Sequence, residues 1–192
     1  MRNRCPCCGV SKSMKTIVDA TYLRQYITDV PDFPVPGVTF KNITPLFRNP
    51  KAFRMAVDGL ITHFKDADAQ VIVGIESRGF LLSAPMAYVM EAGKIMARKK
   101  GKLPGEVIEC AHGLEYGDSV LEIHADAIRK GERVLIIDDV LATGGTVGAA
   151  VNLVERLGGI VVGLGFLIEL PLGGREKLAR YEIRSLIQYE PE

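Results

Sequence analysis

The 192-residue sequence predicts a mixed α/β fold with a central, mostly parallel twisted sheet flanked by helices. Short apolar runs rich in Val and Ile are typical of strands that are buried on both faces. The segments between them repeat apolar residues at helical spacing, and strands that alternate with helices favour a parallel sheet with right-handed crossovers. Between residues 106 and 127 the pattern changes to a two-residue alternation, which indicates an antiparallel insertion.

The first part of the chain contains two predicted helices separated by a proline-rich stretch. Apolar residues favour a helix over residues 22–27, and the prolines up to Pro36 favour irregular structure. An amphipathic helix is predicted over residues 50–65, with Pro50 near its start. Its apolar face comprises Phe53, Ala56, Val57, Leu60, Ile61 and Phe64.

The rest of the chain supplies the predicted sheet. Within the antiparallel insertion, which we call the flap and place at about residues 103–127, Leu121 and Ile123 alternate with Glu122 and His124. Residues from Val147 onward repeat at helical spacing. Strands are predicted over residues 71–75, 94–98, 134–137 and 161–168, with a further helix over residues 80–91.

The end of the strand over residues 134–137 has the chemistry of a phosphate site. Asp138 and Asp139 follow the strand, and the run Ala142-Thr143-Gly144-Gly145-Thr146 leads into a helix. Free N–H groups and the dipole at a helix N-terminus favour a phosphate, and glycines let the backbone approach it closely. The two acids can hold sugar hydroxyls, so the pattern predicts a site for a phosphorylated ribose.

Two common phosphate motifs do not fit this loop. The P-loop of nucleotide-binding proteins requires a Lys after its glycines, and no Lys follows the glycines here. The acids precede the glycines, whereas the dinucleotide fingerprint places its acid about 20 residues after them. The alternative without a ligand is a tight turn whose two acids cap the helix.

Other polar segments follow neighbouring strands. Ligands of open α/β sheets bind beyond the carboxyl ends of the strands. Arg78 follows one predicted strand, and Lys99 and Lys102 follow the next. We therefore expect these three cations to face Asp138 and Asp139. Such a site suits a substrate with a pyrophosphate at one end and sugar hydroxyls in the middle.

The acidic strand end and its loop resemble the phosphoribosyl pyrophosphate signature of type I phosphoribosyltransferases. Further segments narrow this to a resemblance to the adenine phosphoribosyltransferase family, which implies transfer of the phosphoribosyl group of 5-phosphoribosyl 1-pyrophosphate to adenine. The products would be AMP and pyrophosphate, in purine salvage. The segments are residues 32–45, 76–80, 98–105, 114–117 and 174–178.

The resemblance also implies a domain organisation. A single phosphoribosyltransferase domain is expected over residues 17–192, with an N-terminal hood at about residues 30–46. The preceding residues 1–16 are expected to form a flexible leader that contains Cys5, Cys7 and Cys8. Alternatives for this leader are a bound metal, because Cys5 and Cys8 have zinc-knuckle spacing, and redox-reactive thiols.

Binding of phosphoribosyl pyrophosphate is implied for two acids, several cations and the phosphate loop. Asp138 and Asp139 would accept hydrogen bonds from the ribose and stabilise an oxocarbenium-like transition state. Mg²⁺, held mainly by substrate oxygens, would neutralise the pyrophosphate together with Arg78 and Lys102. A cis peptide bond is implied between Glu76 and Ser77. The implied binding residues are Glu76, Ser77, Arg78, Arg98, Lys99, Lys102, Asp138, Asp139, Ala142, Thr143, Gly144, Gly145 and Thr146.

The resemblance assigns the base and its proton to other segments. Phe40 would stack on adenine while backbone groups of Thr39 and Lys41 read its edge, and Leu170 would close the apolar side. Glu115 in the flap would accept the proton that adenine loses. The implied catalytic residues are Glu115, Arg78, Asp138 and Asp139.

A homodimer is also implied. Arg98 stands where a cation of one subunit would reach the partner's active site, and its alternative is a place in a solvated basic run.

Composition restricts the other possibilities. A formal net charge of +1 argues against a nucleic-acid surface. No apolar stretch is long enough for a membrane span, and basic residues near the N-terminus lack the apolar run of a secretory signal. We therefore expect a cytoplasmic protein whose partners are its small-molecule substrates.

Two alternative functions remain. One is a related transferase that prefers hypoxanthine, guanine or xanthine, which a charged hood would favour. The other is a regulator that senses phosphoribosyl pyrophosphate and binds a nucleic acid or a protein. A regulator would be expected to carry a basic extension or to lack Glu115.

Overall fold

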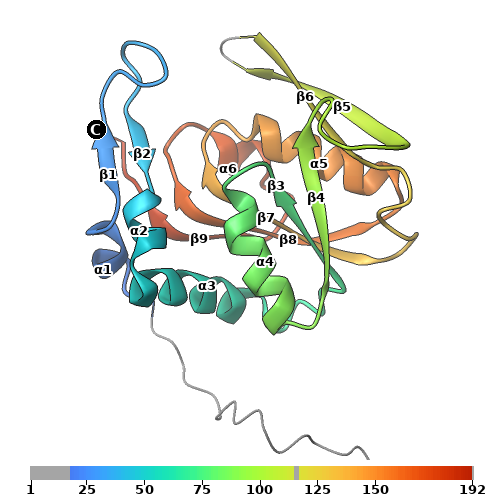
Figure 1. Ribbon diagram of the computed structural model, residues 1–192, viewed down its shortest axis with the longest axis horizontal. Coiled ribbons are helices and arrows are strands. Elements are labelled where there is room, and N and C mark those ends of the chain that lie inside the picture. The colour runs from blue at the N-terminus through green and yellow to red at the C-terminus, as the bar shows by residue number, and fades with distance from the viewer. Residues whose placement is uncertain (1–17, 115–116, 192) are drawn as a thin grey trace, which may run out of the picture.

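The computed structural model describes residues 18–114 and 117–191 and confirms the predicted fold class. A seven-stranded sheet has the order β5-β6-β4-β3-β7-β8-β9 (Figure 1). Five neighbouring strands, β4, β3, β7, β8 and β9, run parallel. The β5–β6 hairpin pairs antiparallel with β4 at the edge of the sheet. The strands are β3 (Val71–Ile75), β4 (Gly93–Lys99), β5 (Val107–Leu114), β6 (Gly117–His124), β7 (Arg133–Leu141), β8 (Ile160–Glu169) and β9 (Ile183–Gln188).

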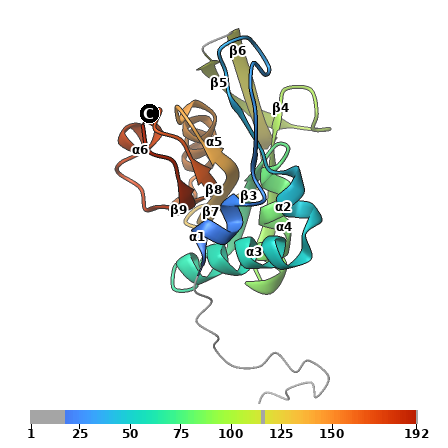
Figure 2. The ribbon, with the colours of Figure 1, turned by 90° about the vertical axis from the view of Figure 1, so that its left-hand side faces the viewer.

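Helices cover both faces of this sheet (Figure 2). Val134 and Ile136 of β7 pack in a core that includes α5 (Gly145–Arg156). Leu135 and Ile137 pack on the opposite face, in a core with α3 (Pro50–Phe64) and α4 (Gly79–Val89). This alternation follows from the two-residue period of a strand, and burial on both faces accounts for the continuous apolar run.

Several predicted elements occur at or near the predicted positions. The helix α3 and the strand β3 match within one residue, and the flap is a hairpin of β5 and β6. The first helix, α1 (Ala20–Arg24), begins earlier than predicted because Asp19 accepts a hydrogen bond from the Tyr22 N–H at 3.0 Å and caps it. It also ends earlier, so the predicted range 22–27 was wrong at both ends.

The strand β7 is longer than the predicted 134–137. It continues through Asp138 and Asp139 to Leu141, and Asp138 is paired with Phe166 of β8. The two acids therefore belong to the strand rather than to the loop after it. The sheet itself fixes their backbone.

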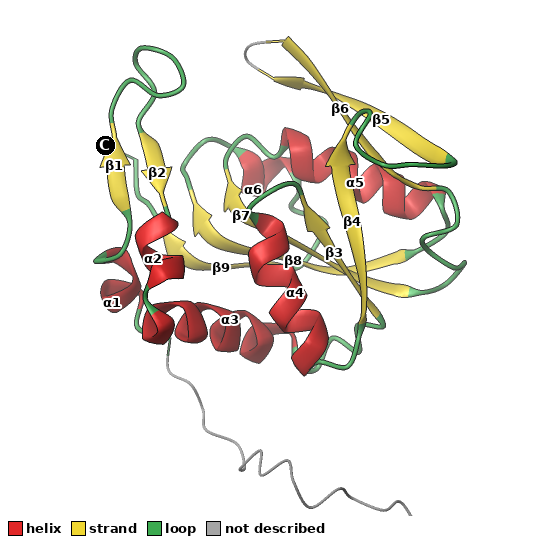
Figure 3. Ribbon diagram, viewed as in Figure 1, coloured by secondary structure: helices red, strands yellow, loops and turns green. Residues whose placement is uncertain are grey.

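Five elements, including β9, were not predicted from the sequence. The hood contains a separate two-stranded sheet of β1 (Thr28–Val30) and β2 (Phe40–Asn42), followed by α2 (Thr44–Arg48) (Figure 3). Near the C-terminus, α6 (Gly174–Lys177) precedes β9. The hood strands have three residues each, which is too short for a periodic pattern, and β1 is exposed.

The predicted leader of residues 1–16 and the predicted proton acceptor Glu115 lie outside the described residues. Within residues 18–114 and 117–191, no helix combines the length and the apolar character needed to cross a membrane.

Candidate active site

A cavity of about 760 Å³ lies between the hood and the carboxyl ends of the parallel strands. It collects predicted residues from distant parts of the chain, which are Thr39, Phe40, Lys41, Glu76, Ser77, Arg78, Lys99, Asp138, Asp139, Ala142, Thr143, Thr146 and Leu170. Its further lining consists of Pro34, Val35, Val38, Leu121, Val140 and Leu172, which are all apolar.

Four predicted residues do not line this cavity. Gly144 and Gly145 are buried where the phosphate loop enters α5. Arg98 donates to Glu76 and to the carbonyl of Lys102, so its guanidinium is bound within its own chain. Lys102 lies in the turn after β4. Burial raises the pKa of the nearby Glu76, but the Lys99 N–H, Arg98 and, to a smaller extent, the charge of Lys102 lower it.

The acids at the end of β7 are almost completely buried. Asp138 and Asp139 are 8% and 5% exposed, and Asp138 Oδ1 accepts a hydrogen bond from the Asp139 N–H at 2.9 Å. Burial, and then the charge of Asp139, raises the pKa of Asp138 well above its ordinary value. Burial also raises the pKa of Asp139, although the charge of Arg78 partly opposes this.

Arg78 connects these acids with the hood. Its Nε lies 2.7 Å from Asp139 Oδ2, but this buried oxygen accepts no aligned hydrogen bond from any described residue. The guanidinium carbon also lies 4.7 Å from the centre of the Phe40 ring, in a cation–π contact. Phe33 contacts the same ring edge-on at 5.2 Å. Arg78 therefore occupies the middle of the site, between the acids and the predicted base position.

The side of the cavity predicted to bind pyrophosphate begins at the end of β3. The peptide bond between Glu76 and Ser77 is cis, as the family resemblance implies. A Cβ atom at Gly79 would lie 2.8 Å from the carbonyl oxygen of Ile137 and 2.9 Å from Asp138 Oδ1. Because residue 79 has no side chain, the start of α4 lies directly against the acidic end of β7.

The phosphate loop, residues 142–146, turns sharply between β7 and α5. Gly144 has a φ of +75°, a conformation that favours glycine, and its carbonyl accepts the Gly148 N–H at 2.9 Å. The loop rests on the start of α6, where a Cβ atom at Gly174 would lie only 2.3 Å from the Ala142 carbonyl oxygen. The backbone of α6 therefore limits the position of this loop.

An ion pair between the buried Glu169 and the partly exposed Arg175 supports the same region and was missed from the sequence. Glu169 at the end of β8 accepts hydrogen bonds from Arg175 at 2.6 and 2.5 Å and from Ser185 at 2.6 Å. Burial alone would raise the pKa of Glu169, but these hydrogen bonds lower it. Arg175 belongs to a segment that carries the family resemblance, and that was the only signal available.

A cavity that joins a phosphate loop, two buried acids at a strand end and a hood over a parallel sheet defines a type I phosphoribosyltransferase. In agreement with this, residues 46–188 match the phosphoribosyl transferase domain family.

Solved structures of adenine phosphoribosyltransferases are similar to the chain over most of its length. The enzyme from Thermoanaerobacter pseudethanolicus has 45% identity and a TM-score of 0.87, covering 89% of this chain and 100% of its own. The enzyme from Rhodothermus marinus has 48% identity and a TM-score of 0.85, with 88% and 98% covered. The Saccharomyces cerevisiae enzyme, complexed with adenine and an imino-altritol bisphosphate, has 38% identity and a TM-score of 0.82, with 88% and 98% covered. The chain belongs to the adenine phosphoribosyltransferase family.

Proposed function

We infer that this protein transfers the phosphoribosyl group of 5-phosphoribosyl 1-pyrophosphate to adenine, giving AMP and pyrophosphate in purine salvage. The observation that carries this conclusion is the single cavity in which a phosphate loop, two buried acids and an aromatic hood meet. Membership in a family whose solved members at 45–48% identity are adenine phosphoribosyltransferases supports adenine as the base and phosphoribosyl transfer as the reaction.

The acids and the phosphate loop would hold the phosphoribosyl group. Free N–H groups at the start of α5, with the hydroxyls of Thr143 and Thr146, would bind the 5-phosphate. Asp138 and Asp139 would accept hydrogen bonds from the ribose hydroxyls. Their negative charge would stabilise the positive charge that develops on the sugar as the pyrophosphate leaves.

The hood would hold the base. Phe40 would stack on adenine, for which Arg78 must move away from the ring face that it now covers. Reading of the adenine edge by backbone groups of Thr39 and Lys41 is supported by the position of the Lys41 side chain. Its ammonium is bound to Asp29 at 2.8 Å and lies 4.5 Å from the Tyr189 ring, so it serves the structure of the hood.

Mg²⁺ is proposed to accompany the phosphoribosyl pyrophosphate. Among the described residues, no group of three or more His, Cys, Asp or Glu side chains could hold a metal ion. Substrate oxygens would therefore supply most ligands. The acids at the end of β7 fit a supporting role, since Asp139 Oδ2 accepts no aligned hydrogen bond from the described residues. The ion would supply positive charge to the departing pyrophosphate.

Glu115 is proposed to accept the adenine proton. In the sequence it falls between β5 and β6, outside the described residues. The assignment to Glu115 rests on the family resemblance.

We also propose a cytoplasmic homodimer. Exposed apolar residues gather on α4 and on the adjacent strand β4, where Leu81, Tyr88, Val89 and Met96 are 50%, 87%, 57% and 44% exposed. Contiguous exposed apolar surface is typical of protein interfaces. Arg98 lies on the same strand, and its proposed action in the partner's site would require it to leave Glu76.

The test is AMP formation from adenine, phosphoribosyl pyrophosphate and Mg²⁺, with hypoxanthine and guanine in parallel. Of the three bases, we expect only adenine to be converted. For Glu115→Ala we expect kcat to fall about 100-fold or more, the size of effect typical of a general base. The matched control is Glu132→Ala, outside the cavity. Turnover of guanine or hypoxanthine would contradict the base assignment, and binding of the sugar phosphate without turnover would favour a regulator.

A further inference from the structure

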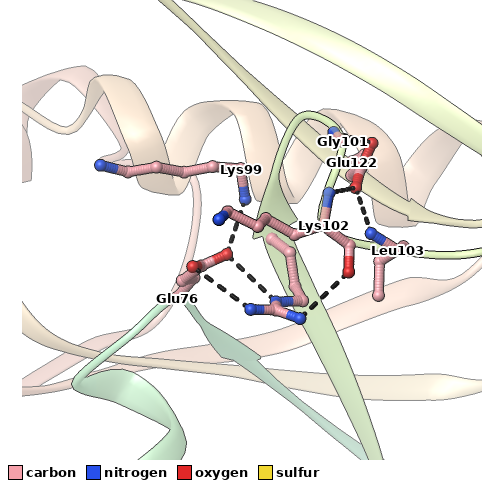
Figure 4. Close-up of polar contacts among 7 residues, drawn as sticks. Glu76, Lys99, Gly101, Lys102, Leu103 and Glu122 are labelled. Atoms are coloured by element: carbon pink, nitrogen blue, oxygen red, sulfur yellow. Dashed lines mark hydrogen bonds and ion pairs between the residues drawn. The ribbon is translucent and has the colours of Figure 1, made fainter.

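The turn after β4, residues 99–103, is held by a buried carboxylate from the flap. Glu122 of β6 is only 2% exposed. Its two oxygens accept hydrogen bonds from three successive backbone N–H groups, those of Gly101, Lys102 and Leu103, at 3.0, 2.8 and 2.7 Å (Figure 4). Burial opposes ionisation of Glu122, but these N–H groups outweigh it and lower its pKa.

A second carboxylate joins this turn to the loop after β3. Glu76 accepts hydrogen bonds from the Lys99 N–H at 2.9 Å and from Arg98 Nε at 3.1 Å. Arg98 in turn donates to the carbonyl of Lys102 at 3.1 Å. The turn is thus fixed on both sides, by Glu122 from the flap and by Glu76 through Arg98.

The held turn carries three ammonium groups, of which that of Lys100 is bound to Glu109 on β5. Lys99 lines the cavity. Burial opposes ionisation of Glu76, but the Lys99 N–H, Arg98 and, last, the charge of Lys102 lower its pKa. In Figure 4 the Lys102 side chain extends from the turn back toward Glu76. A long lysine loses much rotamer freedom when it binds a phosphate, so a fixed backbone reduces the entropy loss on binding.

We propose that Glu122 is a positioning residue for pyrophosphate: it fixes the turn 99–103 and thereby places Lys102 beside the pyrophosphate of the substrate. This inference rests on the proposed function and adds to it a residue that does not touch the substrate. Through the turn, Glu122 would affect binding of the pyrophosphate only, because other elements would bind the base and the 5-phosphate.

The experiment compares Glu122→Gln with Glu109→Gln. Glu109 lies opposite Glu122 on β5, and its side chain binds the Lys100 ammonium at 2.8 Å instead of the backbone of the turn. A glutamine at residue 122 retains one acceptor oxygen and turns an NH₂ group toward N–H donors. We expect the Kd of pyrophosphate and the KM of phosphoribosyl pyrophosphate to rise about tenfold, the effect of one lost charge-assisted contact. The Kd of AMP and the KM of adenine should stay within about twofold.

A double-mutant cycle with Lys102→Ala shows whether Glu122 acts through Lys102. The proposal expects Lys102→Ala to weaken pyrophosphate binding, and Glu122→Gln to add little in its presence. The proposal would be overturned if Glu122→Gln weakened the binding of AMP and of pyrophosphate equally. It would also be overturned if the effects of Glu122→Gln and Lys102→Ala on pyrophosphate binding were fully additive. Unchanged pyrophosphate affinity in Lys102→Ala would overturn it even if the Glu122 variant does not fold. A wild-type protein that binds pyrophosphate but makes no AMP would instead refute the proposed function.

Discussion

Asp138 and Asp139 lie side by side at the end of β7, where burial disfavours the charge that the proposed reaction requires. The folded-state pKa of Asp138 is raised, so its contribution to stability is fully present below the ordinary aspartate pKa. That contribution is lost as the pH rises through the folded-state value. At neutral pH the burial of Asp138 therefore leaves the free energy of unfolding lower than it is at acid pH.

Asp138→Asn should therefore raise the Tm at pH 7 while kcat falls about 100-fold or more. The Tm difference from wild type should shrink as the pH falls toward about 4, because the wild-type acid is then neutral as well. Thermal unfolding between these pH values, together with steady-state kinetics, gives both quantities. Asp66→Asn is the control, since the Asp66 side chain is 90% exposed. A lower Tm for Asp138→Asn at pH 7 would contradict the argument.

The residues that sequence analysis found are those whose type is set by substrate chemistry. Acids for hydroxyls, cations for pyrophosphate and glycines for a phosphate loop form short local patterns. Thirteen of the predicted residues line one cavity, although the two loop glycines do not. Glu122 was missed because its partners lie far along the chain, as with Lys102 at a separation of 20 residues. Glu169 was missed although Arg175 is only six residues away, because a turn separates the end of β8 from the short helix α6 and no periodic pattern links the two. Nothing in the local sequence distinguishes such a carboxylate from a solvated one.

At the scale of elements, the phosphate loop and α6 meet backbone to backbone. A side chain at Gly174 would displace the Ala142 carbonyl, because its Cβ atom would lie 2.3 Å from that oxygen. We expect Gly174→Ala to destabilise the fold by about 1–3 kcal/mol, the usual result of overpacking. It should also weaken the binding of AMP and of phosphoribosyl pyrophosphate to the same extent, since both carry the 5-phosphate.

Chemical denaturation and calorimetric titration with AMP measure these two effects. Gly148→Ala on α5 is the matched control, because a Cβ atom there would have no neighbour within 4 Å. Alanine should leave binding unchanged and, at a helix position, add up to about 1 kcal/mol of stability. If Gly174→Ala binds AMP as the wild type does, the contact with α6 does not set the position of the loop.

The elements were predictable where periodicity is long. The fifteen residues of α3 and the fully buried strand β3 give clear signals. The three-residue strands of the hood give none, because they form by pairing with each other across the proline-rich loop. The acids of β7 were placed after the strand because their polarity hides the continued pairing with β8.

At the scale of the whole molecule, the apolar surface of α4 and β4 is the candidate dimer interface. Tyr88 has the largest exposure in this surface, at 87%. We expect wild-type protein to have the mass of a dimer in light scattering, and Tyr88→Glu to shift the mass toward the monomer, because a buried unpaired charge is unfavourable. Ile160→Glu is the control, at 50% exposure on β8. A wild-type monomer at micromolar concentration, or equal effects of both variants, would contradict this interface.

The segment from Leu170 to Gly174 has a consequence for attempts to engineer a different base preference. Leu170 lines the cavity at the proposed adenine position. Gly174, four residues later, is in close contact with the backbone of the phosphate loop. The Leu170 N–H also donates to the carbonyl of Leu141, just before that loop. A designer who reshapes the wall at Leu170 to admit a larger purine would therefore move the phosphate cradle as well. New base specificity at this wall should come with compensating changes around α6, so libraries ought to vary both together.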